Sequence, residues 1–404
     1  MAAFIRVCKR EIRQIISKPI YWFSTLILPL FVLLVMTTIF SNGLIRELPI
    51  GVVDEDNSSI SRQIARHLET VPELKVKNIY SNITQAQNDV VKKKIYGFVY
   101  IPHNLEKNIK ANKEVEIPFY YHYAFLSVGG EVLSGFYSYL TTLATLPLYN
   151  IATTLDIDKK KVEAIAFPIT ADFHPLNNPS LDYTIYLSYT YFYVVFQILI
   201  LLTIAYSIGM ETKDNTVSTW ISAGGFDRYA CMYGKLLPYF VIYSIISCFA
   251  NMILFNVVKI PLASNLLDIS FTSILLVAAT ISLSVFIFSI NPNLPLIISF
   301  ISMFGSLGAS LVGITFPVTS MPKIMEWASW LFPLRHFAII SQNLCDEDLS
   351  LFYTWKNYVA LLLFLLLPFV TMARILPKKI FFSTTIIHNK HERLFKTYNT
   401  NRHS

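Results

Sequence analysis

The chain begins with a basic segment that runs directly into a long apolar stretch without any charge. Residues 1–18 contain five Lys or Arg residues and one carboxylate, and residues 20–40 contain no charged residue. As an α-helix, an apolar stretch of this length spans about 31 Å, close to the thickness of the hydrocarbon core of a bilayer. The sequence therefore predicts a membrane-spanning helix over residues 20–40, preceded by a separate helix.

Residues 1–18 place apolar and basic side chains on different faces of a helix. At helical spacing, one face carries Ile5, Cys8, Ile12 and Ile15, and another carries Arg6, Lys9, Arg10 and Arg13. Such an amphipathic helix lies along the inner surface of a membrane, where anionic headgroups attract Lys and Arg. A cleaved signal peptide is the alternative, but its apolar region would be about 7–15 residues long and would end in a small-residue cleavage site. We expect a retained cytoplasmic helix.

Further apolar stretches of membrane-spanning length follow. Charged residues make up only 15% of the sequence, well below the roughly 25% of soluble domains. The predicted spans are residues 20–40, 183–210, 236–258, 269–290, 294–316 and 357–373. The predicted fold is a polytopic α-helical membrane protein with six transmembrane helices, five of them in residues 183–373.

The distribution of Lys and Arg predicts the orientation of these spans. Residues 374–404 form a basic tail with seven Lys or Arg residues and a single acidic residue, Glu392. With the basic start of the chain, this predicts that both termini are cytoplasmic and that residues 41–182 lie outside. Because residues 41–182 contain 14 basic and 16 acidic residues, the net charge of +7 comes from the cytoplasmic flanks, and we expect no nucleic-acid binding.

Residues 41–182 alternate between short apolar runs and polar helical segments. Strands are predicted at residues 48–53, 74–80, 96–101 and 115–123. Strands that alternate with helices predict an extracytoplasmic α/β domain, inserted between the first and second spans. The acidic turn Asp54-Glu55-Asp56 has the oxygen atoms of a cation site, but we favour an ordinary Asx turn and expect no metal.

The sequence contains no recognisable catalytic constellation. The eight histidines are scattered, and Gly234-Lys235 resembles the end of a phosphate-binding loop, except that Tyr229 occupies a position that must be glycine. The predicted spans contain no Asp, Glu, Lys or Arg that could cycle a proton. We therefore expect neither an enzyme nor a proton-driven transporter.

Four separated motifs, in the same order along the chain, resemble those of ABC-2-type transporter permeases, including multidrug exporter subunits with a large extracytoplasmic domain between the first two spans. These motifs are Arg10-Glu11 before the first span, Val52-Val53-Asp54 to Ser61-Arg62 after it, Glu211, Thr216, Gly234 and Lys235 in an inner segment, and Phe316-Pro317, Met321-Pro322 and Pro333 to His336 in an outer segment. Lys213, Asn215 and Gly224-Gly225 depart from the pattern of the family.

The resemblance implies the permease of an ATP-driven exporter of a hydrophobic or amphiphilic substrate. Inner segment 210–235 would be the coupling loop that contacts a separate ABC ATPase, through Glu211, Thr216, Gly234 and Lys235, with Arg10 and Glu11 in the connecting helix. Outer segment 317–335 would be a re-entrant gate built around Pro317, Met321, Pro322, Pro333 and His336. Aromatic side chains of the second span, such as Tyr189, Tyr193 and Phe196, and small residues of the fifth, such as Gly305 and Gly308, would line the path.

The resemblance also implies the surroundings of the chain. We expect the bacterial plasma (inner) membrane, contact with membrane lipid, a second identical or paralogous permease chain, and in some assemblies a periplasmic adaptor. The chain itself would bind no cofactor, because ATP and Mg²⁺ would be bound by the partner subunit. A simpler interpretation also remains open for each segment: residues 210–235 could be an ordinary inner loop, and residues 317–335 a plain outer loop. The alternative function is a membrane-anchored receptor or cell-contact protein that acts through its extracytoplasmic domain.

Overall fold

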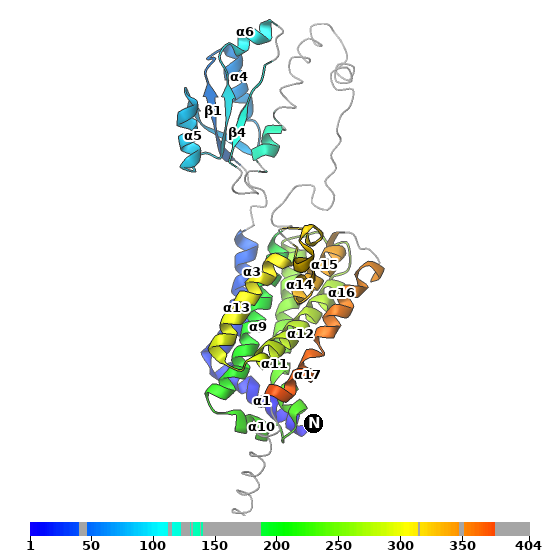
Figure 1. The fold of residues 1–404 in the computed structure, drawn as a ribbon. Coiled ribbons are helices and arrows are strands. Elements are labelled where there is room, and N and C mark those ends of the chain that lie inside the picture. The colour runs from blue at the N-terminus through cyan, green and yellow to red at the C-terminus, as the bar shows by residue number, and fades with distance from the viewer. Residues whose placement is uncertain are drawn as a thin grey trace, which may run out of the picture. The chain divides into compact units, whose positions relative to one another are not determined.

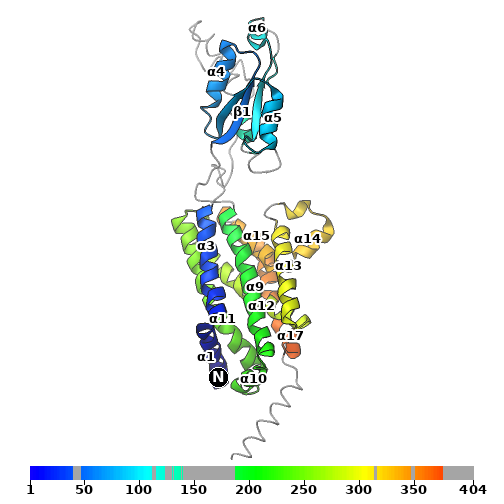
Figure 2. The ribbon, with the colours of Figure 1, turned by 90° about the vertical axis from the view of Figure 1, so that its left-hand side faces the viewer.

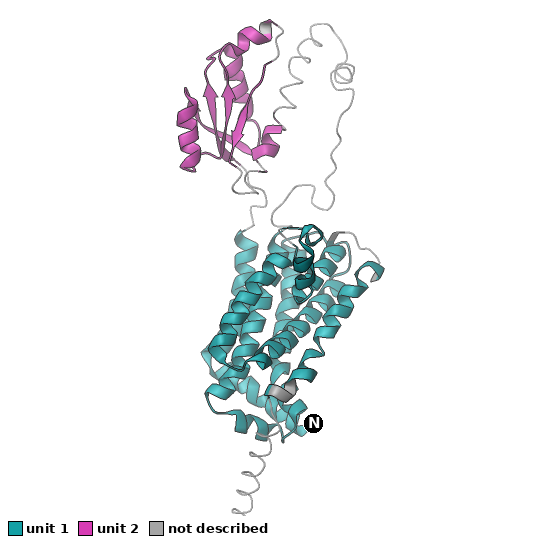
Figure 3. Ribbon diagram, in the orientation of Figure 1, with its two compact units in different colours: residues 1–43, 176–404 teal, residues 44–175 magenta. Residues whose placement is uncertain are grey.

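The chain divides into two compact units, residues 1–43 with 176–404, and residues 44–175 (Figure 3). The computed structural model describes residues 1–39, 47–111, 115–122, 130, 132–137, 139, 187–313, 316–346 and 351–375. Six helices are long and apolar enough to cross a membrane, and a four-stranded sheet lies between the first and second of them in sequence. The predicted fold class is confirmed.

The first unit is helical (Figures 1 and 2). Its α-helices are α1 (Ala2–Ser17), α2 (Pro19–Trp22), α3 (Leu28–Ile39), α9 (Tyr189–Lys213), α10 (Val217–Ala223), α11 (Arg228–Met252), α12 (Leu266–Ile290), α13 (Leu294–Leu311), α14 (Lys323–Ser329), α15 (Pro333–Asp346), α16 (Leu351–Phe364) and α17 (Leu367–Ile375). Two π-helical turns, Phe23–Ile27 and Ile253–Val257, continue the helices that precede them, and a short 3₁₀ turn, Val318–Ser320, precedes α14.

The candidate spans are Pro19–Ile39, Tyr189–Lys213, Arg228–Val257, Leu266–Ile290, Leu294–Leu311 and Phe352–Thr371. Most of their ends lie within a few residues of the predicted ones, but the third span starts eight residues earlier than predicted. Inner segment 210–235 is consequently mostly helical, because it consists of the end of α9, the short α10 and the first two turns of α11.

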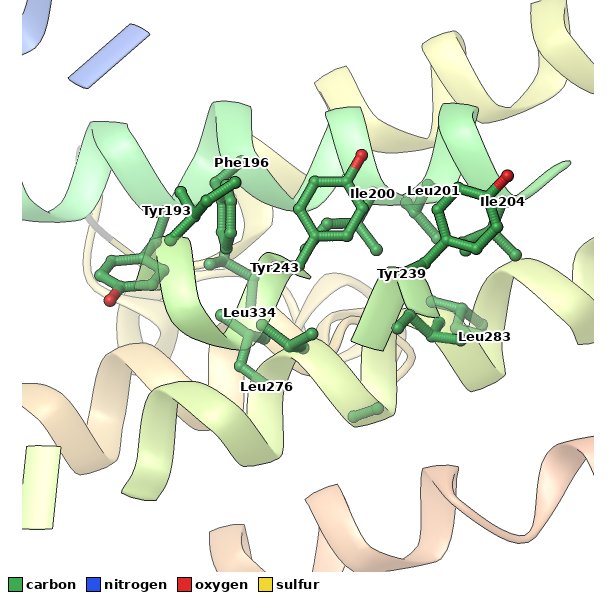
Figure 4. Packing of buried hydrophobic residues seen from close by; sticks show 14 of the residues in the cluster. Tyr193, Phe196, Ile200, Leu201, Ile204, Tyr239, Tyr243, Leu276, Leu283 and Leu334 are labelled. Carbon is green, nitrogen blue, oxygen red and sulfur yellow. The ribbon is translucent and has the colours of Figure 1, made fainter. Parts of the chain in front are cut away.

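Helices α9 and α12 form the centre of the helical unit. They are apolar around their whole circumference, as expected of helices surrounded by others, and most of their side chains are buried. The side chains that meet where α9, α11 and α12 pack together include Tyr193, Phe196, Ile200, Leu201, Ile204, Tyr239, Tyr243, Leu276 and Leu283 (Figure 4). In contrast, the first span and α13 expose most of their surface.

This packing uses the residues that were expected to line a path. Tyr193 and Phe196 are buried within the chain, and Tyr193 donates a hydrogen bond to Asn251 Oδ1 over 2.6 Å. In α13, Gly305 packs against Ile198 of α9, where a Cβ atom would approach the Ile198 side chain to 2.6 Å. The structure therefore gives these side chains a packing role within the chain, which period and composition do not distinguish from a path-lining role.

The second unit contains a sheet with the order β2-β1-β3-β4. Strands β1 (Leu48–Asp54), β2 (Leu74–Tyr80) and β3 (Gly97–Ile101) are parallel, and the short β4 (Phe119–Tyr121) is antiparallel to β3. The helices of this unit with described bounds are α4 (Ser59–Leu68), α5 (Ile83–Val91) and α6 (Leu105–Lys110). Residues 140–182 of the predicted domain, and residues 376–404 of the predicted tail, lie outside the described residues.

The acidic turn after β1 is an Asx turn. Asp54 Oδ1 accepts hydrogen bonds from the backbone N–H groups of Asp56 and Asn57, and Asp54 Oδ2 accepts one from the Ser61 hydroxyl. Asp56 Oδ2 accepts a hydrogen bond from the backbone N–H of Glu106, in the first turn of α6. These oxygens hold the loops at the carboxyl end of the sheet, and within the described residues no group of three or more His, Cys, Asp or Glu side chains could hold a metal ion.

Candidate coupling site

Helix α1 packs along α11 through one of its faces. Val7, Glu11 and Ile15 recur every four residues and are buried, so they form the face toward the protein. The helix ends at Lys18, whose backbone is extended, as is favoured before a proline, and Pro19 then begins the first span. The amphipathic helix is therefore a separate element, as its sequence predicts.

A glycine in α11 allows α1 to approach closely. A Cβ atom at Gly234 would lie 2.9 Å from Val7 Cβ and 3.0 Å from the backbone oxygen of Phe4. The backbone of Phe4 and the stiff, β-branched side chain of Val7 face this position, and neither group can move aside unless α1 shifts. Gly234 thus determines how near α1 lies to α11.

Four charged side chains from three helices meet at this crossing. Arg10 of α1 donates two hydrogen bonds to the carboxylate of Glu211, at the end of α9, over 2.6 and 2.8 Å. Lys235 of α11 lies 2.8 Å from Glu11 Oε2 and 2.9 Å from Glu211 Oε1. We call Arg10, Glu11, Glu211 and Lys235 the ion cluster. Its members are buried, except that Arg10 is 20% exposed.

The ion cluster is electrically neutral and its carboxylate oxygens are fully paired. Ser207 and Tyr239 donate to Glu11 Oε1 over 2.9 and 2.8 Å, and the Thr216 hydroxyl donates to Glu211 Oε2. Burial of charges costs several kcal/mol per ion, and only this kind of complete pairing offsets that cost. Burial alone would lower the pKa of Arg10, but its hydrogen bond to Glu211 raises it, so Arg10 stays charged.

Helix α10 rests on the ion cluster through Trp220. The Lys235 ammonium lies 5.2 Å from the centre of the Trp220 ring, and the Trp220 indole N–H donates to the backbone oxygen of Cys231 over 3.0 Å. Further contacts connect α1 to the segments on either side of Trp220: Lys18 pairs over 3.0 Å with Asp214, the residue that ends α9, and Arg6 Nε donates to the carbonyl of Ala223, the last residue of α10, over 3.2 Å. The polar side chains on the exposed face of α10 are Ser218, Thr219 and Ser222.

The structure thus brings all six predicted inner residues together: Arg10, Glu11, Glu211, Thr216, Gly234 and Lys235. It places Glu211 and Lys235 in the interior and not on a contact surface. Sequence reasoning missed Ser207, Tyr239 and Trp220. Ser207 precedes Glu211 by four residues and Tyr239 follows Lys235 by four, so helical spacing could have identified both as neighbours of the charged residues.

The predicted outer residues do not form one cluster. Pro317 and Pro322 are exposed residues that precede the 3₁₀ turn and α14, while Met321 is half-buried between these elements. Pro333 begins α15, and His336 is fully buried. The ring of His336 connects two segments, since Nε2 lies 3.2 Å from the Trp330 backbone oxygen and Nδ1 lies 3.0 Å from the side-chain amide of Asn357 in α16. Burial lowers the pKa of His336.

Comparison with known proteins agrees with this architecture. Residues 19–374 match the family described as ABC-2 family transporter protein. Two relatives, both described as "Probable multidrug ABC transporter permease YbhR", come from Escherichia coli strain K12 and Escherichia coli O157:H7. Each is 22% identical over 185 residues, which cover 46% of this chain and 50% of the relative. The chain thus aligns with about half the length of these relatives.

The family of this chain can now be assigned from the six candidate spans, the sheet inserted between the first two of them, and the family match over most of the sequence. The chain belongs to the ABC-2 transporter family and is a multi-pass protein of the plasma membrane.

Proposed function

We propose that this chain is the permease subunit of an ATP-driven exporter of a hydrophobic or amphiphilic substrate, and that its ion cluster couples the spans to a separate ABC ATPase. The observation that carries the coupling proposal is that Arg10, Glu11, Glu211 and Lys235 hold α1, α9 and α11 together directly beneath α10. A buried network with fully paired groups is rigid, so these three helices respond to a force as one body.

Helix α10 is the element through which a force would enter. Its outward face carries Ser218, Thr219 and Ser222, while Trp220 on its inward face packs against Lys235. An ATPase subunit that seats on the outward face would displace α10, and Trp220 would pass this displacement to the ion cluster. In this mechanism ATP and Mg²⁺ bind to the ATPase subunit, and no cofactor binds to this chain.

The surroundings of the permease follow from the same arrangement. Both termini and α10 lie in the cytoplasm, and the sheet unit lies outside. Ile5, Ile12 and Ile16 of α1 are exposed on a face different from the buried one and contact membrane lipid. A second permease chain, identical or paralogous, completes the translocation path, and a periplasmic adaptor can join the outer unit.

The test places a bulky side chain on the outward face of α10. Ser222→Trp should prevent co-purification of the ABC ATPase that accompanies the unmodified chain, and should abolish the ATPase activity of reconstituted vesicles. The matched control is Ser320→Trp, which should leave both unchanged. Ser320 is an exposed serine in the turn before α14, and α14 lies at the end of the helical unit opposite to α10 (Figure 1). An unmodified chain that brings down no ATPase would reject the exporter proposal and favour a receptor. Undiminished binding by Ser222→Trp would reject only the assignment of α10.

A further inference from the structure

An apolar groove runs along the surface of α16, away from the ion cluster. It encloses about 520 Å³ and its lining is almost entirely apolar. This volume is within the usual range of ligand sites, which are also mainly apolar with few polar groups. Trp330, which follows α14, lines one side of the groove. The small side chain of Ala360 also lines it and leaves space between its larger neighbours.

The groove is aligned with the helix axis. One side consists of Trp355, Val359 and Leu363 of α16 and of Leu367, the first residue of α17. These residues are spaced by four along the candidate span Phe352–Thr371, which a short turn at residues 365–366 interrupts. From Trp355 to Leu367 the rise is about 18 Å, a little over half of the hydrocarbon core of a bilayer. The groove thus has the length and direction of one acyl chain in one leaflet.

The head of the groove has the character of a membrane interface. Trp330 is the C-terminal cap residue of α14, Trp355 belongs to the first turns of α16, and both line the groove. Helix α14 lies at the end of the helical unit opposite to α10 (Figure 1), and tryptophan is enriched at the level of lipid headgroups. Lys356 contributes the one cation of the lining, and among the described residues it has no carboxylate partner. An anionic group above this end would meet an unneutralised charge.

A second cation lies behind the same wall. Arg335 is only 7% exposed and its guanidinium carbon lies 4.8 Å from the centre of the Trp330 ring. Its Nε and Nη1 atoms have no hydrogen-bond partner among the described residues. Glu326, the acidic residue that attracts Arg335, is already paired with Lys323 over 3.0 Å. Among the described side chains, Lys356 and Arg335 are thus two cations at the head of the groove that have no carboxylate of their own.

We propose that this groove is a binding site for an anionic phospholipid, whose acyl chain lies along α16 and whose phosphate-bearing headgroup is held by Lys356. The occupant is a bilayer lipid because the lining residues other than Trp330 belong to the candidate span Phe352–Thr371, and because the groove has about the length of one leaflet. The lipid is anionic because Lys356 and Arg335 are the charges at its head. The proposal is independent of the ATPase and of the direction of transport.

Tryptophan fluorescence tests this assignment directly, because two of the five tryptophans of the chain line the groove. The variants Trp22→Phe and Trp327→Phe remove two exposed tryptophans that do not line the groove. The remaining tryptophan outside the groove, Trp220, is buried and packs against Lys235. In detergent, phosphatidylglycerol with brominated acyl chains should quench the remaining fluorescence saturably. Half-maximal quenching should occur at about a fivefold lower concentration of brominated phosphatidylglycerol than of brominated phosphatidylcholine. This factor corresponds to the attraction of one lysine to an anionic headgroup, about 1 kcal/mol.

Two variants separate headgroup from acyl-chain recognition. Lys356→Gln should remove the preference for phosphatidylglycerol but keep saturable quenching, and Lys356→Arg should retain the preference. Val359→Phe fills the groove and should abolish saturable quenching by both lipids, whereas Leu362→Phe, on the same helix but outside the groove, should not. Equal quenching of the unmodified groove by both lipids, or equal behaviour of the two phenylalanine variants, would overturn the proposal.

Discussion

At the scale of single residues, the ion cluster is unusual because it buries charged side chains inside a bundle of apolar helices. Glu11 and Lys235 are completely buried, yet every carboxylate oxygen in the cluster has a donor. Removing one partner of a buried pair is costly because it leaves the other charge without compensation, whereas removing both can be nearly neutral. The cluster should therefore respond very differently to single and to double substitution.

Lys235→Met should lower the free energy of unfolding in mixed micelles by about 3–5 kcal/mol, since the buried Glu11 would lose its hydrogen-bonded cation and would keep only Arg10, at 3.8 Å and already paired with Glu211. Adding Glu11→Gln should recover most of this loss, because Arg10 and Glu211 then remain as a neutral pair. The control is Lys323→Met, which breaks an exposed pair with Glu326 and should cost less than about 1 kcal/mol. Equal costs for Lys235→Met and Lys323→Met would contradict a structural role for the cluster.

At the scale of elements, the distance between α1 and α11 is the sensitive parameter. Gly234→Ala places a Cβ atom against Val7 and Phe4, so α1 must shift, and Lys235 on the next position then loses its short contact with Glu11. We expect ATP hydrolysis by the reconstituted complex to fall several-fold while membrane insertion is unchanged.

The matched control for this change is Gly130→Ala, since no atom lies within 4 Å of a Cβ at Gly130. It should be neutral or slightly stabilising, because alanine is preferred to glycine in a helix. Full ATPase activity of Gly234→Ala would show that the approach of α1 to α11 is not needed for coupling.

The elements of this chain differ in how far they could be predicted. The spans and the first three strands were predictable because apolar length and period are local properties. Strand β4 is shorter than predicted, and the third span is longer, since Arg228 to Lys235 form helix in spite of their charges. The motifs of the family pointed to Glu211 and Lys235, but no local pattern shows that the two are buried together. That depends on α1 crossing α11 at Gly234.

At the scale of the molecule, the family match establishes an ABC-2 transporter family protein, and the source of energy for transport is the main property to predict. All four charges of the ion cluster lie at one end of the spans, beside α10. In the described parts of the spans no Asp, Glu, Lys or Arg lies near mid-length, so no series of titratable groups connects the two sides of the membrane. We therefore expect that transport is not coupled to a proton gradient.

Transport should accordingly depend on ATP and not on the gradient. In inverted vesicles that contain this chain and its ABC ATPase, uptake of ethidium should persist after an ionophore has collapsed the proton gradient, and it should cease when ATP is replaced by a non-hydrolysable analogue. Vesicles with this chain alone should neither take up the dye nor bind a fluorescent ATP derivative. Uptake that follows the gradient and ignores ATP would contradict the proposal of an ATP-driven exporter.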